Sequence, residues 1–102
     1  MASYTVARAK HATLTAATVE TITFSVDVVS VEVVNRDGTA EIYFTIDGTT
    51  PVAGADDTEV VPAAVGAAQK LGSPGSRWVT DTVKLISTGT PKYSVVGYRG
   101  DE

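Results

Sequence analysis

Side chains that branch at Cβ dominate this chain: Val, Thr and Ile account for 35 of its 102 residues. Such side chains lose χ1 freedom in a helix and pack well on the pleated surface of a sheet. The sequence therefore predicts a sheet protein rather than a helical one. Apolar residues make up 43% of the chain, which is enough for one packed core, and the length corresponds to a single domain.

Residue types and charge argue against several function classes. The chain has no Cys, so it can form no disulfide, no thiolate zinc site and no Cys nucleophile. Its single His, His11, rules out a multi-histidine metal centre. Eight basic against twelve acidic residues give a formal net charge of −4, the wrong sign for binding nucleic acid. No apolar run reaches the length of a membrane span, and residues 1–6 lack the pattern of a secretory signal.

Two successive segments alternate between apolar and polar residues, which predicts strands of a half-buried sheet. The alternation in residues 20–26 has the opposite parity to that in residues 29–33. The expected inward residues of the two segments are Ile22, Phe24, Val26, Val29, Val31 and Val33. A change of parity requires an extra residue, so we expect a β-bulge or a tight corner near Asp27-Val28.

Residues 31–46 are predicted to form a hairpin around Asn35-Arg36-Asp37-Gly38, because Asn, Asp and Gly tolerate the positive φ of tight turns. Its expected core residues are Ala40, Ile42, Phe44 and Ile46, with Glu41, Tyr43 and Thr45 facing outward.

Turn residues separate several further predicted strands. These cover residues 58–61, which Pro62 ends, then 77–79 with 82–86, and finally 93–98; residues 63–75 are expected to be a long connection. Six or seven short strands with turns between them indicate an all-β fold, either a sandwich or a small barrel. Of the two, we expect an antiparallel β-sandwich of immunoglobulin-like type. We expect residues 1–12 to be an extended N-terminal arm or edge strand, residues 13–99 the single sandwich domain, and residues 100–102 a polar tail.

No motif in the sequence predicts catalysis or metal binding. Asn35-x-Asp37-Gly38 and Asp56-Asp57-x-Glu59 resemble fragments of a calcium loop, but neither supplies enough oxygen ligands at the required spacing. There is no Gly-x-Ser-x-Gly elbow and no glycine pattern that cradles phosphate. Arg99-Gly100-Asp101 matches an adhesion tripeptide, a match short enough to arise by chance. We therefore expect a protein that is not an enzyme and uses no metal or cofactor.

A protein interface is the remaining kind of site. Tyr and Trp are favoured at interfaces and on sugar-binding faces, since they offer rigid area with a polar end. The candidate interface residues are Tyr4, Val6, Arg8, Tyr43, Trp78 and Tyr98. The alternatives are that Trp78 is a core residue and that Tyr43 is an ordinary cross-strand partner on the surface.

Four segments resemble a family of small β-sandwich virion proteins encoded by tailed bacteriophages of actinobacteria. They are VEVVNRDGTAEIYF at residues 31–44, DGTTP at 47–51, VPAA at 61–64 and TVKLIS-x-G-x-P-x-YSV at 82–95, and the resemblance spans roughly residues 14–98. The family consists of capsid decoration, head-fibre and minor tail proteins, and it has no catalytic residues to transfer.

The resemblance implies a structural virion protein, assembled in the host cytoplasm, that decorates the outer capsid surface and stabilises the shell. The implied partner is the major capsid protein or a tail protein, and the implied state is a homo-oligomer such as a trimer, with no nucleic acid or membrane involved. The alternative is a minor tail or head-fibre domain that binds host-surface glycans.

Overall fold

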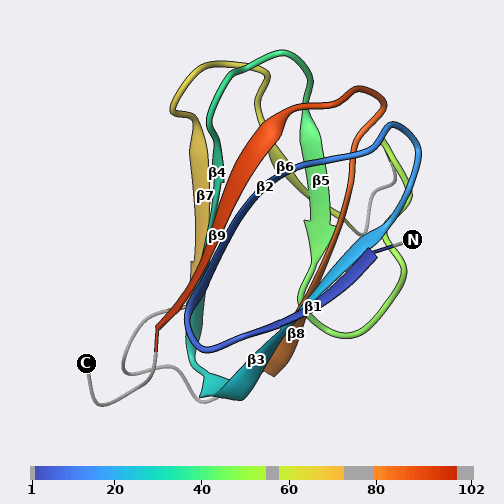
Figure 1. The fold of residues 1–102 in the computed structure, drawn as a ribbon. Helices are drawn as coiled ribbons and strands as arrows, with labels where there is room; N and C mark the ends of the chain where they lie inside the picture. Colours follow the sequence, from blue (N-terminus) through green and yellow to red (C-terminus); the bar gives the residue numbers. More distant parts are fainter. Residues whose placement is uncertain (1, 55–57, 73–79, 99–102) are drawn as a thin grey trace.

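In the computed structural model, residues 2–54, 58–72 and 80–98 are described, and they form two sheets packed face to face (Figure 1). The strands are β1 (Ala2–Val6), β2 (Ala9–Thr13), β3 (Glu20–Val28), β4 (Ser30–Asn35), β5 (Ile42–Thr45), β6 (Glu59–Val61), β7 (Ala68–Gly72), β8 (Thr80–Ile86) and β9 (Lys92–Tyr98). The all-β sandwich is thus confirmed, with nine strands in these ranges rather than six or seven. These ranges include no helix, and so none of membrane-spanning length.

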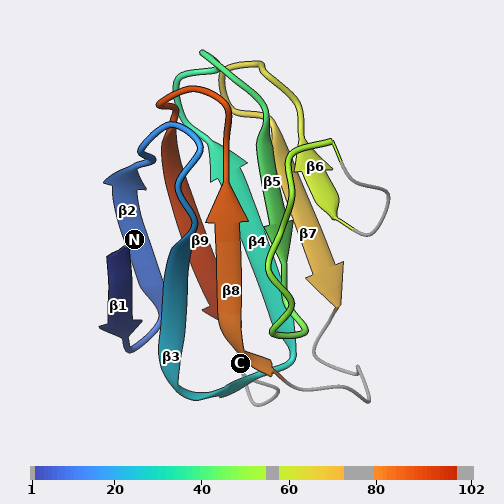
Figure 2. The ribbon, with the colours of Figure 1, turned by 90° about the vertical axis from the view of Figure 1, so that its right-hand side faces the viewer.

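The strand order is β1-β3-β8-β5-β6 in one sheet and β2-β9-β4-β7 in the other (Figure 2). Every pairing is antiparallel except that of β1 with β3. The immunoglobulin-like assignment is not confirmed. In that fold the last two strands share a sheet, whereas β8 and β9 lie in different sheets.

The core lies between the two sheets, and most of its buried members are inward-facing residues at alternate positions of the strands. Its buried members are Leu14, Ile22, Phe24, Val28, Val31, Val33, Ile42, Phe44, Val61, Val83, Leu85, Tyr93 and Val95. Burying a side chain of this size stabilises the fold by about 1.5–3 kcal/mol. The predicted strands at residues 58–61, 82–86 and 93–98 correspond to β6, β8 and β9.

The parity change occurs as predicted, but it begins earlier and involves more residues. The pairing of β3 with β8 shifts register between Thr23 and Val28, so Val26 is 40% exposed and Val28 takes the core position instead. Val26 was therefore wrongly predicted to face inward. After Val28 the chain turns a corner at Val29 and enters the other sheet at Ser30.

The predicted hairpin across residues 31–46 is wrong, because β4 and β5 belong to different sheets and do not pair. The turn residues form a crossing between sheets. Asn35 is fully buried, and its Nδ2 donates hydrogen bonds to the carbonyl oxygens of Ala40 (2.8 Å) and Pro62 (3.0 Å). Its Oδ1 accepts a bond from the N–H of Gly38, which has φ +68°.

Two further expectations about facing and secondary structure need correction. Thr45, predicted to face water, is buried, and its hydroxyl donates to the carbonyl oxygen of Thr49 at 2.6 Å. The predicted connection of residues 63–75 contains strand β7. Residues 77–79 and the tail lie outside the described residues.

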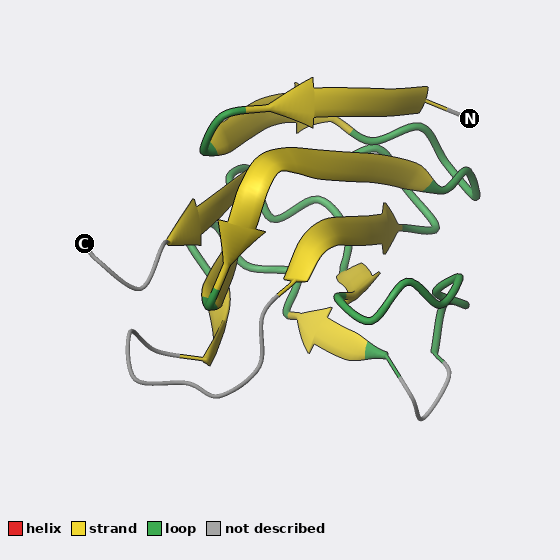
Figure 3. Cartoon of the chain, turned by 90° about the horizontal axis from the view of Figure 1, so that it is seen from below, coloured by secondary structure: helices red, strands yellow, loops and turns green. Residues whose placement is uncertain are grey.

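Residues 2–13 form an edge strand in each sheet: β1 flanks β3, and β2 flanks β9. Figure 3 shows this side of the sandwich at the top of the view. Leu14, directly after β2, is buried in the core.

Candidate functional site

Two of the candidate interface residues, Arg8 and Tyr98, lie together at the outer face of the four-stranded sheet. The register aligns Ala9, Val96, Glu32 and Lys70 in one row across β2, β9, β4 and β7. Because Val31, Val33 and Val95 fill the core, the alternate residues of these strands face away from it. The row across this face mixes small side chains with charged ones.

Tyr98 lies on this face between two cations. The Lys70 Nζ is 4.6 Å from the centroid of the Tyr98 ring, and the Arg8 Cζ is 6.0 Å from it. The Tyr98 hydroxyl donates a long bond of 3.4 Å to Glu32 Oε1. We call these four residues the Tyr98 cluster. Cation–π contacts at such exposed positions contribute about 0.5–1 kcal/mol each.

Sheet register explains why the Tyr98 cluster forms. Glu32 and Lys70 are direct cross-strand partners, an arrangement in which opposite charges attract. The N–H of Gly97 donates to the carbonyl oxygen of Arg8 at 2.8 Å, which holds the link between β1 and β2 beside the end of β9. The cluster carries a formal charge of +1 on a chain whose net charge is −4. It can accept a carboxylate or a second aromatic ring.

The other candidate residues lie elsewhere. Tyr43 is on the outer face of the five-stranded sheet, in a row with Val60 and Ile86. Its hydroxyl donates to Glu41 Oε1 at 2.8 Å, and this bond to a carboxylate raises the pKa of Tyr43. The structure thus brings Arg8 and Tyr98 together and places Tyr43 on the opposite face. Trp78 lies outside the described residues.

Tyr4 and Val6 face the core rather than the outer surface. They pair with Ile22 and Phe24 of β3 and pack against the core from the edge of the sandwich. The Lys10 Nζ of β2 lies 4.0 Å from the centroid of the Tyr4 ring. This contact links the two sheets at the side of the sandwich where β1 and β2 are the edge strands.

A buried polar pair in the core was missed by the sequence reasoning. The Tyr93 hydroxyl donates to Glu20 Oε1 at 2.9 Å, and both residues are almost completely screened from water. Burial, together with this bond, raises the pKa of Tyr93 well above its usual range. A usable signal was present, because Glu20 shares the inward parity of Ile22 and Phe24. Lys70 was missed because β7 was not predicted.

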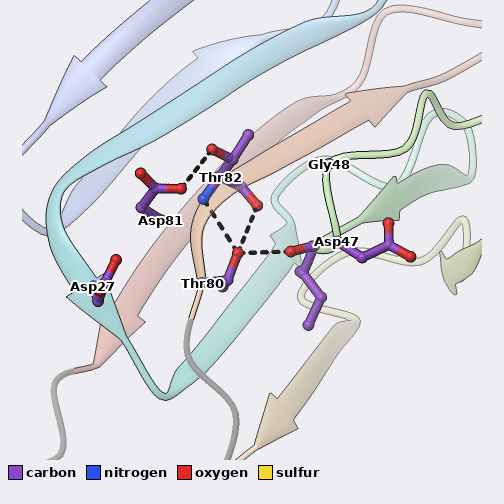
Figure 4. A pocket seen from close by; sticks show the side chains of 7 residues that line it. Asp27, Asp47, Gly48, Thr80, Asp81 and Thr82 are labelled. Atoms are coloured by element: carbon purple, nitrogen blue, oxygen red, sulfur yellow. Dashed lines mark hydrogen bonds between the residues drawn. The ribbon is translucent and has the colours of Figure 1, made fainter.

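An open polar cavity of about 320 Å³ lies at one end of the sandwich. Figure 4 shows Asp27 and Asp81 on one side and Asp47 on the other. Asp47 Oδ1 accepts bonds from the hydroxyl (2.6 Å) and the backbone N–H (3.1 Å) of Thr49, which lower the pKa of Asp47. The Asp81 carboxylate accepts a bond from the Thr82 hydroxyl at 2.9 Å.

In residues 2–54, 58–72 and 80–98, no group of three or more His, Cys, Asp or Glu side chains is arranged to hold a metal ion. Of the two calcium-like fragments, one uses Asn35 for buried turn contacts, and Asp56 and Asp57 of the other lie outside the described residues. Comparisons with protein-family models, with curated proteins and with solved structures find no match for this chain.

Proposed function

We propose that this chain is a structural virion protein of a tailed bacteriophage that decorates the outer capsid surface and stabilises the shell. Two features support the proposal. Residues 14–98 resemble small virion sandwich proteins, as described from the sequence. The fold is a compact sandwich whose described buried side-chain polar atoms all have hydrogen-bond partners.

The Tyr98 cluster is the observation that carries the docking part of the proposal. Tyr and Arg are among the residues that contribute most strongly to protein interfaces. A Tyr ring buries a large area with few torsions to order, and a guanidinium forms several hydrogen bonds in a fixed planar geometry. Tyr98 and Arg8 lie together at the outer face of the four-stranded sheet, with Lys70 against the same ring. The preferred partner surface on the capsid presents carboxylates beside an apolar patch. Many copies bound in this way would bridge neighbouring capsid subunits and resist shell expansion.

The test uses empty capsids of the major capsid protein encoded in the same genome, mixed with the full chain and sedimented. We expect co-sedimentation of the unaltered chain and at least tenfold weaker binding of Tyr98→Ala. Tyr43→Ala is the matched control, because Tyr43 is a half-buried tyrosine on the opposite face. Failure of the unaltered chain to bind these capsids would overturn the capsid proposal. Equal binding of all three proteins would overturn the assignment of the docking face.

The alternative, a tail or head-fibre domain that binds host-surface glycans, is favoured by a different observation. Tyr43 lies beside the exposed Val60 on the five-stranded sheet, and the Glu41 carboxylate at its hydroxyl is a hydrogen-bond acceptor for sugar. A glycan array probed with the unaltered chain, Tyr43→Ala and Trp78→Ala tests it. Binding that both substitutions abolish, with Tyr98→Ala unaffected, supports this alternative. Absence of any glycan binding contradicts it.

A further inference from the structure

Among the four sheet edges of the described residues, the β1 edge is the least protected against pairing with another strand. Strands at sheet edges carry unpaired backbone N–H and C=O groups, and proteins shield them with charges, prolines or very short strands. β6 has three residues and is followed by Pro62, while β7 has Lys70 at its centre and β2 contains Lys10. β1 has no charged residue and no proline, and it pairs with β3 over five residues without a register shift.

We propose that the β1 edge pairs antiparallel with β1 of a second copy of this chain, across a twofold axis through Tyr4. The result is one continuous sheet with five strands from each copy. This is a different symmetry from the trimer that the family resemblance implies. The inference goes beyond the proposed function and does not depend on it.

The pattern of β1 is self-complementary in this register. Antiparallel pairing centred on Tyr4 places Ser3 opposite Thr5 of the second copy, and Tyr4 opposite Tyr4. Ser3 and Thr5 are exposed and align with Thr21 and Thr23 on the outer face of the sheet. Their hydroxyls can hydrogen-bond across the new strand pair. Tyr4 faces the core side of the sheet and is half-exposed at the edge of the core. In the proposed pair it contacts Tyr4 of the second copy there.

Charge selects β1 over β7, an edge strand of the same length, for a second copy. The same antiparallel arrangement at β7 would place Lys70 opposite Lys70, and like charges directly opposite each other destabilise a strand pair. β1 itself contains no charged residue, so this pairing places no charged residue of the strand opposite its own copy. Lys10 of β2 lies over the Tyr4 ring on the core side. A twofold contact is also closed, so it ends with two chains instead of a filament.

The register can be tested by disulfide trapping, because the chain has no Cys of its own. Full-length Ser3→Cys and Thr5→Cys proteins are prepared separately, mixed and oxidised mildly. Opposed residues of an antiparallel pair come within the Cα separation that a disulfide needs. We expect a covalent heterodimer in the mixture and at least tenfold less cross-linking in either protein alone. Thr13→Cys mixed with Ser3→Cys is the control, since Thr13 is exposed on β2.

A second measurement tests whether the dimer forms without introduced cysteines. Light scattering after size exclusion should give the unaltered chain twice the chain mass, and Thr5→Lys, which places a charge on the β1 edge, should give the monomer mass. A monomer at every concentration of the unaltered chain, or a trimer, overturns the proposal. Cross-linking of Ser3→Cys to itself as efficiently as to Thr5→Cys overturns the antiparallel register. Equal cross-linking in the Thr13→Cys control also counts against it.

Discussion

The Tyr93 hydroxyl and the Glu20 carboxylate are joined by a hydrogen bond of 2.9 Å inside the sandwich, although their residues lie in different sheets. A carboxylate buried without a donor costs more free energy than a neutral polar group does. The core therefore depends on a polar contact between the two sheets as well as on its apolar packing.

Tyr93→Phe should lower the free energy of unfolding by about 1–3 kcal/mol, because it removes the donor and leaves the Glu20 carboxylate buried. Tyr43→Phe is the matched control, since it removes a similar tyrosine–glutamate bond at an exposed position and should cost about 0.5 kcal/mol or less. Urea unfolding followed by circular dichroism measures both. Equal losses for the two variants would show that the buried bond contributes no more than the exposed one.

Asn35→Asp should destabilise the fold by at least about 1–3 kcal/mol. The carboxylate keeps an acceptor for Gly38 but loses both N–H donations to the carbonyl oxygens of Ala40 and Pro62. Asp37→Ala, in the same turn, removes exposed bonds to Thr39 and should destabilise the fold less than Asn35→Asp does. Thermal and urea unfolding compare the two. An Asn35→Asp protein as stable as Asp37→Ala would contradict the role assigned to the buried amide.

Gly38→Ala should destabilise the fold more than Gly48→Ala. Both glycines have positive φ (+68° and +86°), so each alanine carries a backbone strain of about 1–2 kcal/mol. A Cβ on Gly38 would also lie 2.6 Å from the backbone nitrogen of Val65, whereas a Cβ on Gly48 meets no atom within 4 Å. The overlap adds about 1–3 kcal/mol for Gly38→Ala alone. Similar unfolding midpoints for the two variants would show that the backbone at Val65 moves away from the added Cβ at no cost in stability.

Thr49→Val should raise the pKa of Asp47, because it removes the hydroxyl that donates to the carboxylate at 2.6 Å. The pKa of Asp47 is lowered in the folded chain relative to its ordinary value of 3.8. The Asp47 carboxylate therefore contributes its full share of the folding stability above pH 3.8. This contribution is lost as the pH falls through the lowered pKa that Asp47 has in the folded chain. NMR titration of the Asp47 carboxyl carbon checks the shift. Thr50→Val is the control and should leave the titration unchanged, whereas an unmoved pKa in Thr49→Val would disprove the assignment.

The candidate site was only partly accessible from the sequence. Arg8 and Tyr98 were both identified as interface residues, but they stand at opposite ends of the chain, and no local pattern shows that they meet. Lys70 lies in β7, whose sequence AQKLG has little apolar alternation and follows a stretch rich in Ala and Gly. Tyr4 and Val6 have the residue types of an interface, yet their parity in β1 turns them toward the core.

The sequence by itself determined the fold class and part of the core. Side-chain alternation has a period of two and is a local property, so Phe24, Ile42 and Phe44 were assigned to the inside from their neighbours alone. The tertiary structure alone decided which strands pair. Asn35-Arg36-Asp37-Gly38 has the residue types of a hairpin turn, and these suit a crossing between sheets equally well, because the backbone of a tight turn does not depend on where the next strand goes. Partner strands are selected by which surfaces bury most apolar area over the whole chain, and a local pattern does not contain that information.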